Sequence, residues 1–139
     1  MPIHVEITSQ DRSIFSGDAD IVVVPGTLGE MGILPNHSPL LSTLKFGVIR
    51  VRSKADEKVF TVAGGIVEVQ PDQVTILADS AENVDEIDVT RAEAARKRAE
   101  ELLQKTIPQD TDTYLSLQAA LKRSNLRLDS VRKYRKSHI

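Results

Sequence analysis

The composition of the chain changes abruptly near Ile87. All seven glycines lie at or before position 65, and after Ile87 alanine, glutamate, lysine, arginine and leucine dominate. These residue types have high helix propensity. One change of this kind within 139 residues predicts two parts, which we place at residues 1–85 and 86–139. Because a chain of this length buries only one modest core, we expect the second part to be an appendage.

The first part has the pattern of short β-strands. Apolar and polar residues alternate at residues 4–8, and residues 21–24 are a continuous β-branched run. Turn residues such as Ser16-Gly17-Asp18, Pro25-Gly26 and Pro71-Asp72 separate the runs. This spacing is typical of an antiparallel β-sandwich or barrel rather than of βαβ units. Further strands are expected at residues 47–52, 59–63, 66–70 and 74–77.

The second part predicts an α-helical hairpin. Asp88 is a plausible N-cap for a helix that runs to about Lys105, and Pro108 ends it. A second helix begins near Asp112. The helix surfaces expected to face each other carry Val89, Ala92, Ala95, Ala99 and Leu102 or Leu103 on the first helix, and Tyr114, Leu117, Leu121, Ser124, Leu128 and Val131 on the second.

The alanines on the first helix let the two helices approach closely but contribute little apolar area. A buried methyl-sized group contributes about 0.8 kcal/mol, so the closed hairpin gains only a few kcal/mol before entropy is subtracted. A second helix with an apolar stripe and many cations can instead pack into another groove. The hairpin is therefore a candidate for an element with two stable arrangements.

The charge of the chain is unevenly distributed, although the net charge is only -2. A basic tail predicts an anionic partner, either an acidic protein surface, nucleic acid, lipid headgroups or nucleotide phosphate. The alternative is a solvated basic face. Only Tyr134 offers a nearby aromatic ring, and we therefore expect no nucleic acid partner. The cations are Lys122, Arg123, Arg127, Arg132, Lys133, Arg135 and Lys136.

Several classes of site are excluded by what the sequence lacks. There is no cysteine, so disulfides and thiolate sites cannot form. The first residues show no secretory signal, no apolar run approaches the length of a membrane span, and no Gly-rich phosphate loop ends in Gly-Lys-Ser/Thr. His37, Glu30 and Ser38 within one loop do not supply a complete catalytic set. His4 and His138 are terminal. We expect no catalytic residue, no metal site and no required cofactor.

Several stretches together match one known family. The stretch from Gly29 to Pro39 contains Gly-x-x-Gly-Ile-Leu-Pro-x-His-x-Pro, and Gly64-Gly65 precedes Val67-Glu68-Val69. Residues 74–78 and the segment Ile87-Asp88 with Arg91-Ala92 follow in the same order. Together they cover nearly the whole chain, and the sequence resembles the epsilon subunit family of F-type ATP synthases.

The resemblance implies a structural and regulatory subunit without catalytic activity. It implies a β-sandwich that docks on the gamma subunit and on the c-ring, with a peripheral position at the cytoplasmic face of the bacterial cell membrane. Glu30, Met31 and His37 then become candidates for these interfaces. The alternative is that Glu30 is a solvated turn residue and that His37 only packs against or caps a turn.

The resemblance also implies a role for the second helix in restraining ATP hydrolysis. In the family this helix can leave the hairpin and approach an acidic segment of the catalytic beta subunits in the alpha-beta head. The cations that suit this contact are Lys122, Arg123, Arg127, Arg132, Lys133 and Arg135.

In some family members the closed hairpin binds ATP as a regulatory ligand. The motif Ile/Leu-Asp-x-x-Arg-Ala is matched from Ile87 to Ala92. The chain departs from the pattern at Ser116 and Pro108. Asp88 can also be explained as a helix cap, and Arg91 as an ion-pair partner of Asp85 or Glu86. The sequence therefore leaves ATP binding open. The positions that carry over are Glu82, Asp88, Arg91, Ala92, Arg98, Arg123 and Arg127.

Overall fold

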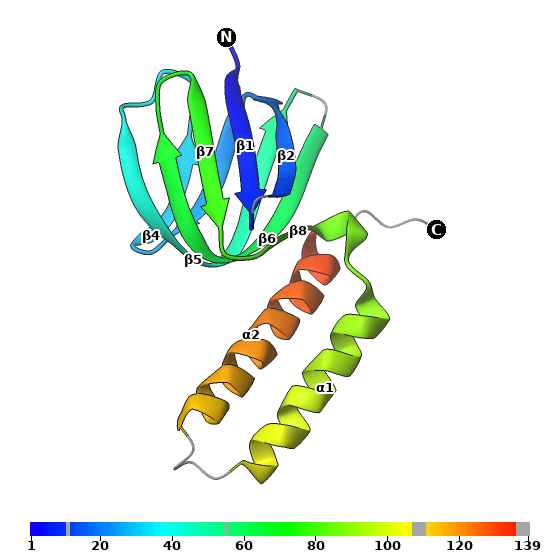
Figure 1. Cartoon of the computed structure of the whole chain (residues 1–139). Coiled ribbons are helices and arrows are strands. Elements are labelled where there is room, and N and C mark those ends of the chain that lie inside the picture. Colours follow the sequence, from blue (N-terminus) through cyan, green and yellow to red (C-terminus); the bar gives the residue numbers. More distant parts are fainter. Residues whose placement is uncertain (11, 55, 107–110, 136–139) are drawn as a thin grey trace. The chain divides into compact units, whose positions relative to one another are not determined.

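A computed structural model of the chain describes all residues except 11, 55, 107–110 and 136–139. The chain divides into two compact units, Met1–Asn83 and Val84–Ile139. The first is made of strands and the second of helices (Figure 1). Pro108, Lys136 and His138, which figured in the sequence analysis, lie outside the described residues.

The first unit is a β-sandwich built from one long, strongly folded sheet. The strand order is β2-β1-β7-β6-β5-β3-β4, and β8 pairs with β6. The pairs are antiparallel except β1 with β7, which is parallel. The strands are β1 (Ile3–Ser9), β2 (Arg12–Ala19), β3 (Ile21–Gly26), β4 (Gly29–Ile33), β5 (Leu40–Ser53), β6 (Asp56–Val69), β7 (Gln73–Ala78) and β8 (Ala81–Asn83).

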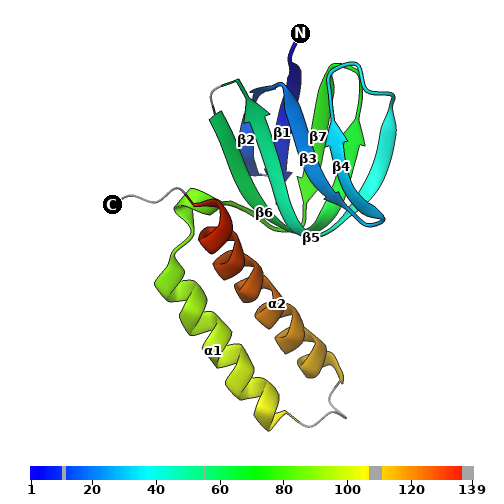
Figure 2. The ribbon, with the colours of Figure 1, turned by 180° about the vertical axis from the view of Figure 1, so that it is seen from behind.

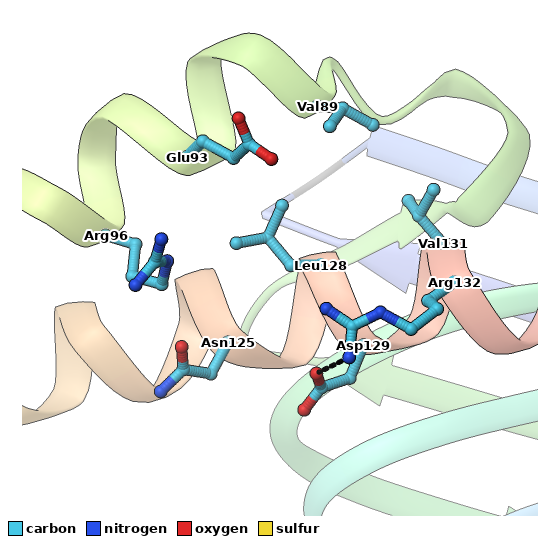
Figure 3. A pocket seen from close by; sticks show the side chains of 8 residues that line it. All are labelled: Val89, Glu93, Arg96, Asn125, Leu128, Asp129, Val131 and Arg132. Atoms are coloured by element: carbon cyan, nitrogen blue, oxygen red, sulfur yellow. Dashed lines mark ion pairs between the residues drawn. The ribbon is translucent and has the colours of Figure 1, made fainter.

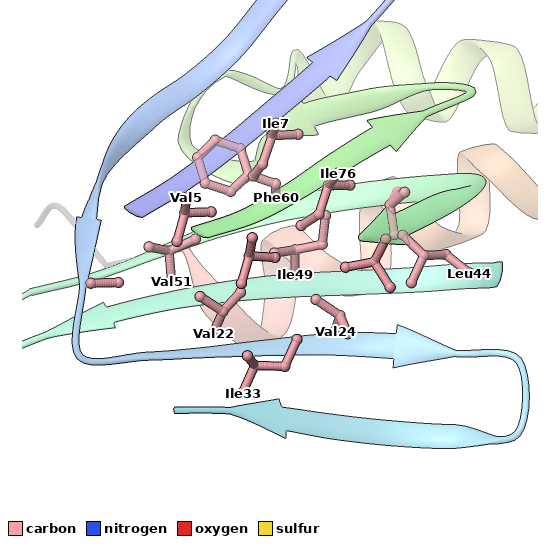
Figure 4. Packing of buried hydrophobic residues seen from close by; sticks show 14 of the residues in the cluster. Val5, Ile7, Val22, Val24, Ile33, Leu44, Ile49, Val51, Phe60 and Ile76 are labelled. Carbon is pink, nitrogen blue, oxygen red and sulfur yellow. The ribbon is translucent and has the colours of Figure 1, made fainter. Parts of the chain in front are cut away.

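The sheet folds around one apolar core (Figures 2 and 4). In β1 the alternation predicted from the sequence is confirmed, since Ile3, Val5 and Ile7 are fully buried. In β3 every residue after Ile21 is buried, as expected for a continuous β-branched run. Phe60 is the largest fully buried side chain, and its ring lies 5.4 Å from that of Phe15.

Strand β6 changes partner at two glycines. It pairs with β8 through residues 60–62 and with β7 from Gly65 to Val69. Gly64 and Gly65 have φ values of 92° and 142°, which side-chain-bearing residues rarely adopt. A Cβ at Gly65 would lie 2.4 Å from the carbonyl oxygen of Leu77. Only glycine fits this bend.

Two segments expected to be a turn and a loop are strands, and Pro25-Gly26, also expected to be a turn, is the end of β3. Ser16, Gly17 and Asp18 lie within β2 and pair with β1, and Gly29 to Ile33 form β4. Both β2 and β4 are edge strands of the sheet, so the backbone on one side of each forms no hydrogen bonds with another strand of this sheet. Polar residues and glycine are tolerated there, so local propensity gave the wrong expectation. The runs at residues 59–63 and 66–70 belong to a single strand, β6, which ends at Val69.

The second unit is an antiparallel pair of helices preceded by a short 3-10 turn, η1 (Val84–Glu86). Helix α1 (Val89–Lys105) begins as predicted, because the Asp88 carboxylate accepts a hydrogen bond of 3.0 Å from the Arg91 backbone N–H. Helix α2 spans Thr111–Tyr134. After α1, the Thr106 hydroxyl donates to the carbonyl oxygen of Leu102 at 2.6 Å.

The fully buried residues of the two helices have small side chains. Ala92 and Ala99 of α1 and Ser124 and Ser130 of α2 are buried. Leu103 is half-buried whereas Leu102 is exposed, which decides between the two predicted positions. The remaining predicted residues of α2 (Tyr114, Leu117, Leu121, Leu128 and Val131) are half-buried. Little apolar area therefore holds the helices together.

Candidate functional site

The two helices of the second unit form a groove along one side. It has a volume of about 460 Å³ and mixes apolar residues with charges of both signs (Figure 3). Arg96 donates to Glu100 at 2.9 Å, and Arg132 lies 3.7 Å from Asp129. The groove is lined by Val89, Glu93, Arg96, Asn125, Leu128, Asp129, Val131 and Arg132.

The opposite side of the hairpin carries four of the arginines singled out in the sequence. With 100° between successive helical residues, Arg91 and Arg98 project to one side of the buried Ala92–Ala99 line, whereas the groove residues project to the other. The same geometry about buried Ser124 places Arg123 and Arg127 opposite the groove. We call Arg91, Arg98, Arg123 and Arg127 the arginine face.

Three members of the arginine face have no carboxylate partner among the described residues: Arg91, Arg98 and Arg123. Arg91 and Arg98 are exposed, and Arg123 is half-buried. The pairing of Arg91 with Asp85 or Glu86, which the sequence left open, is not found there. The arrangement offers unpaired guanidinium groups to an anionic ligand.

The other predicted ATP-binding positions have different surroundings. Asp88 is exposed and its carboxylate caps α1, so one of its oxygens is already engaged by the backbone. Ala92 is buried between the helices. Glu82 lies in β8, in the first unit, and is half-buried.

The remaining cations of α2 and the residue after it fall into two groups. Lys122, Arg132 and Lys133 are exposed, with the Lys133 ammonium 5.2 Å from the centre of the Tyr134 ring. Arg135 is half-buried, and its guanidinium donates to the carbonyl oxygens of Val84 and Ile87. Sequence spacing gave no sign of this difference, because the carbonyl groups lie 51 and 48 residues away.

Glu30 and His37, which the sequence grouped in one loop, lie at opposite ends of β4. Glu30 pairs with Pro25 beside the β3–β4 turn, and its carboxylate lies 3.4 Å from Arg50. His37 follows Asn36, whose N–H donates to Pro71 in the β6–β7 turn, and its Nδ1 contacts the Ser38 carbonyl oxygen at 2.7 Å. Met31 packs against the core.

Both parts of the chain match models of a single protein family. The β-sandwich domain of the ATP synthase delta/epsilon chain matches residues 2–84, and the long α-helix domain of the same chain matches residues 85–131. The chain belongs to the ATP synthase epsilon family. The resemblance seen in the sequence is thereby confirmed.

Curated epsilon chains from several bacteria are similar over most of their length. That of Laribacter hongkongensis is 47% identical over 119 residues, which is 84% of each chain. That of Pelotomaculum thermopropionicum is 48% identical over 73% of this chain and 76% of its own. That of Dehalococcoides mccartyi is 42% identical over 96% of this chain and 95% of its own.

Two solved structures share the fold. A chain in the cryo-EM structure of the Euglena gracilis mitochondrial ATP synthase, comprising OSCP, F1 and the c-ring, has a TM-score of 0.79 and 21% identity, covering 94% of this chain and 81% of that one. A chain in the Tetrahymena thermophila central stalk and c-ring structure has a TM-score of 0.52 and 16% identity, covering 62% and 69%. At these identities the likeness supports the fold alone.

One surface of this epsilon-family chain was missed in the sequence. Ile66 and Leu77 pair directly across β6 and β7, and Leu41 lies opposite Glu68 on the same outward face. Their exposed fractions are 68% for Leu41, 43% for Ile66 and 54% for Leu77. We call Leu41, Ile66 and Leu77 the apolar patch. A signal was present, because Ile66-Val67 and Ile76-Leu77 each place apolar residues on both faces of a strand.

Neither of the helices that the structure describes has the length and hydropathy needed to cross a membrane. Within the described part of the chain, no cluster of three histidine, aspartate or glutamate residues is arranged to hold a metal ion.

Proposed function

We propose that this chain is a non-catalytic rotor component of the ATP synthase central stalk, located at the cytoplasmic face of the bacterial cell membrane. Family membership supports this role. In this role the β-sandwich transmits torque between the gamma subunit and the c-ring. The helical hairpin restrains ATP hydrolysis by the complex.

The apolar patch is the proposed docking surface for the gamma subunit. Three large apolar side chains on one sheet face expose area that a partner can bury. His37 lies at the end of the sandwich where β5 begins, four residues before Leu41. We therefore assign His37 to the same docking surface.

Glu30 is the proposed contact to the c-ring, whereas Met31, which the sequence offered beside it, packs against the core. Glu30 is 65% exposed at its side chain even though it pairs with Arg50, and it lies beside the β3–β4 turn. A surface ion pair of this kind contributes little, so Glu30 can exchange its partner for a cation of the ring. Because β4 separates Glu30 from His37, the two residues serve different contacts.

Helix α2 is the proposed inhibitory element. The exposed side chains of Lys122, Arg132 and Lys133 suit contact with an acidic segment of the catalytic beta subunits. The small buried side chains between α1 and α2 keep the closed state only marginally favoured. A partner with a modest preference for released α2 can therefore shift the equilibrium.

ATP is the proposed ligand of the closed hairpin, and the arginine face is the observation that carries this proposal. Three guanidinium groups that have no carboxylate partner in the described part of the chain lie on one side of two adjacent helices. A triphosphate bound there bridges α1 and α2 through charge-assisted hydrogen bonds and favours the closed, non-inhibitory state. The exposed Asp88 is placed at the start of α1 on the same unit.

A titration of the isolated chain with ATP tests this proposal. Ligand at one hundred times its Kd stabilises the folded state by about 2.7 kcal/mol, which thermal unfolding detects. The stabilisation is expected to vanish in the Arg91→Ala, Arg123→Ala variant. It should persist in the matched Arg96→Ala, Arg132→Ala variant, which removes two arginines from the groove side of the same helices. If millimolar ATP does not stabilise the chain, ATP is not a ligand of the hairpin, and the proposed rotor role is unaffected.

A further inference from the structure

Arg135 makes contacts that set it apart from the other cations near the end of α2. Its backbone N–H donates to the Val131 carbonyl oxygen at 3.1 Å, so it continues the last turn of the helix. Its Nη2 donates to the carbonyl oxygens of both Val84 and Ile87 at 2.6 Å. Arg132 and Lys133, one turn or less away, are exposed.

The two acceptor carbonyl groups belong to buried residues in the segment that precedes α1. Val84 and Ile87 are 1% and 4% exposed; Val84 begins η1, and Ile87 follows η1 just before the N-cap Asp88. Carbonyl groups at the end of a helical turn attract cations, and hydrogen bonds from a charged donor are stronger than neutral ones. Buried carbonyl groups that lose their donor are costly to leave unpaired.

The contact joins the two ends of the hairpin. Because 51 and 48 residues separate Arg135 from its acceptors, the bonds exist only while α2 lies back along α1. The fully buried side chains of α1 and α2 are alanine and serine, which contribute little, and the larger apolar side chains are only half-buried. Two short charge-assisted bonds therefore weigh heavily in the closed state.

We propose that Arg135 is a latch that holds the hairpin closed by binding the Val84 and Ile87 carbonyl groups. When α2 separates from α1, the guanidinium is released from the two carbonyl groups and becomes available to an anionic partner. The same side chain therefore has a role in both the closed and the open state. The consequence for hydrolysis rests on the proposed function, whereas the latch itself is a property of the isolated chain. Arg135 is thus a positioning residue for the hairpin rather than one more exposed cation.

A single engineered thiol can report how often the hairpin opens. The chain contains no cysteine, and Ser124 is 2% exposed in the middle of α2. A Ser124→Cys chain reacts with a thiol reagent only when this position is uncovered, so the labelling rate follows the open fraction. The full-length chain is used, without other subunits.

Adding Arg135→Gln to the Ser124→Cys chain is expected to raise the labelling rate about tenfold, which corresponds to about 1.4 kcal/mol. Arg135→Lys should give a smaller rise, because an ammonium group keeps the charge but not the fork geometry. Lys133→Gln is the matched control, since it removes an exposed charge two residues away and should leave the rate unchanged. Equal rates for Arg135→Gln and Lys133→Gln would overturn the latch.

If the Arg135→Gln chain loses its helical circular dichroism signal, the labelling rate of the Arg135→Lys chain tests the latch instead. Labelling faster than the Lys133→Gln control supports the latch, and labelling at the control rate overturns it. The result is independent of any hydrolysis assay. Faster labelling combined with unchanged hydrolysis in the assembled complex would remove the proposed inhibition and keep the latch.

Discussion

At the scale of single residues, the structure shows that residues of the same type have different roles. Among the cations after Ala120, Arg132 pairs with an acid of its own helix, whereas Arg135 binds backbone carbonyl groups. Among the histidines, His37 contacts a carbonyl oxygen and His4 contacts carboxylates. Residue type alone distinguishes none of these roles, because the partners come from distant parts of the chain.

His4 should make the stability of the sandwich depend on pH. Hydrogen bonds to Asp18 at 3.0 Å and to Glu6 at 3.3 Å raise the pKa of His4 above its usual 6.5. Since the folded state binds the proton more tightly, the stabilisation is fully present below pH 6.5 and is lost as pH rises through the raised pKa. The side chain is 36% exposed, so the effect is expected to stay below about 1 kcal/mol.

Denaturant unfolding of the His4→Gln chain at pH 5.5 and 8.5 measures this effect. The variant should be less stable than the unaltered chain at pH 5.5 and nearly equal to it at pH 8.5. A loss in His4→Gln that is the same at both pH values would contradict the assignment.

At the scale of secondary-structure elements, local signals predicted what local interactions determine. The Asp88 cap and the end of α1 near Lys105 were predicted because they depend on residues close in sequence. Strands β2 and β4 were missed because their polar residues and glycines become strands only through pairing with β1 and β3. The separation of Glu30 from His37 was missed for the same reason, since it depends on β4.

The bend in β6 should be intolerant of any side chain. In Gly65→Ala the new methyl group meets the Leu77 carbonyl oxygen and the Ala78 Cα, at 2.4 and 2.8 Å, in addition to the strain of a φ of 142°. Such strain costs on the order of 1–3 kcal/mol, and the collision adds to it. Gly29→Ala is the matched control, because Gly29 has a φ of 145° and open space around it.

Urea denaturation of both glycine variants gives the comparison. Gly65→Ala should lose clearly more unfolding free energy than Gly29→Ala. Equal losses would mean that the backbone angle alone matters and that the close approach of β7 does not.

At the scale of the whole molecule, the chain combines a well-packed β-sandwich with a weakly packed pair of helices. The sandwich has a continuous apolar core, whereas the helices bury mainly alanine and serine. This contrast agrees with the proposed division of roles, in which the sandwich transmits force and the helices change conformation. The apolar patch was not expected from the sequence, since strand pairing had to bring Leu41 beside Ile66 and Leu77.

Docking through the apolar patch predicts a defined loss of binding. Leu77→Lys places a charge on an outward-facing position that is already 54% exposed, so the fold should persist. Affinity for the gamma subunit, measured by calorimetry, should fall at least tenfold, or by about 1.4 kcal/mol. Leu28→Lys at the fully exposed β3–β4 turn is the control. Unchanged affinity in Leu77→Lys would place the gamma contact elsewhere.

The proposed restraint of ATP hydrolysis by the helical unit can be measured as the rate of hydrolysis by the assembled ATP synthase. The enzyme is compared with the intact chain and with a chain that ends at Asn83, the last residue of the first unit. Hydrolysis should be severalfold faster with the shortened chain, while assembly through the sandwich is retained. Equal rates in two fully assembled enzymes would contradict the proposed restraint.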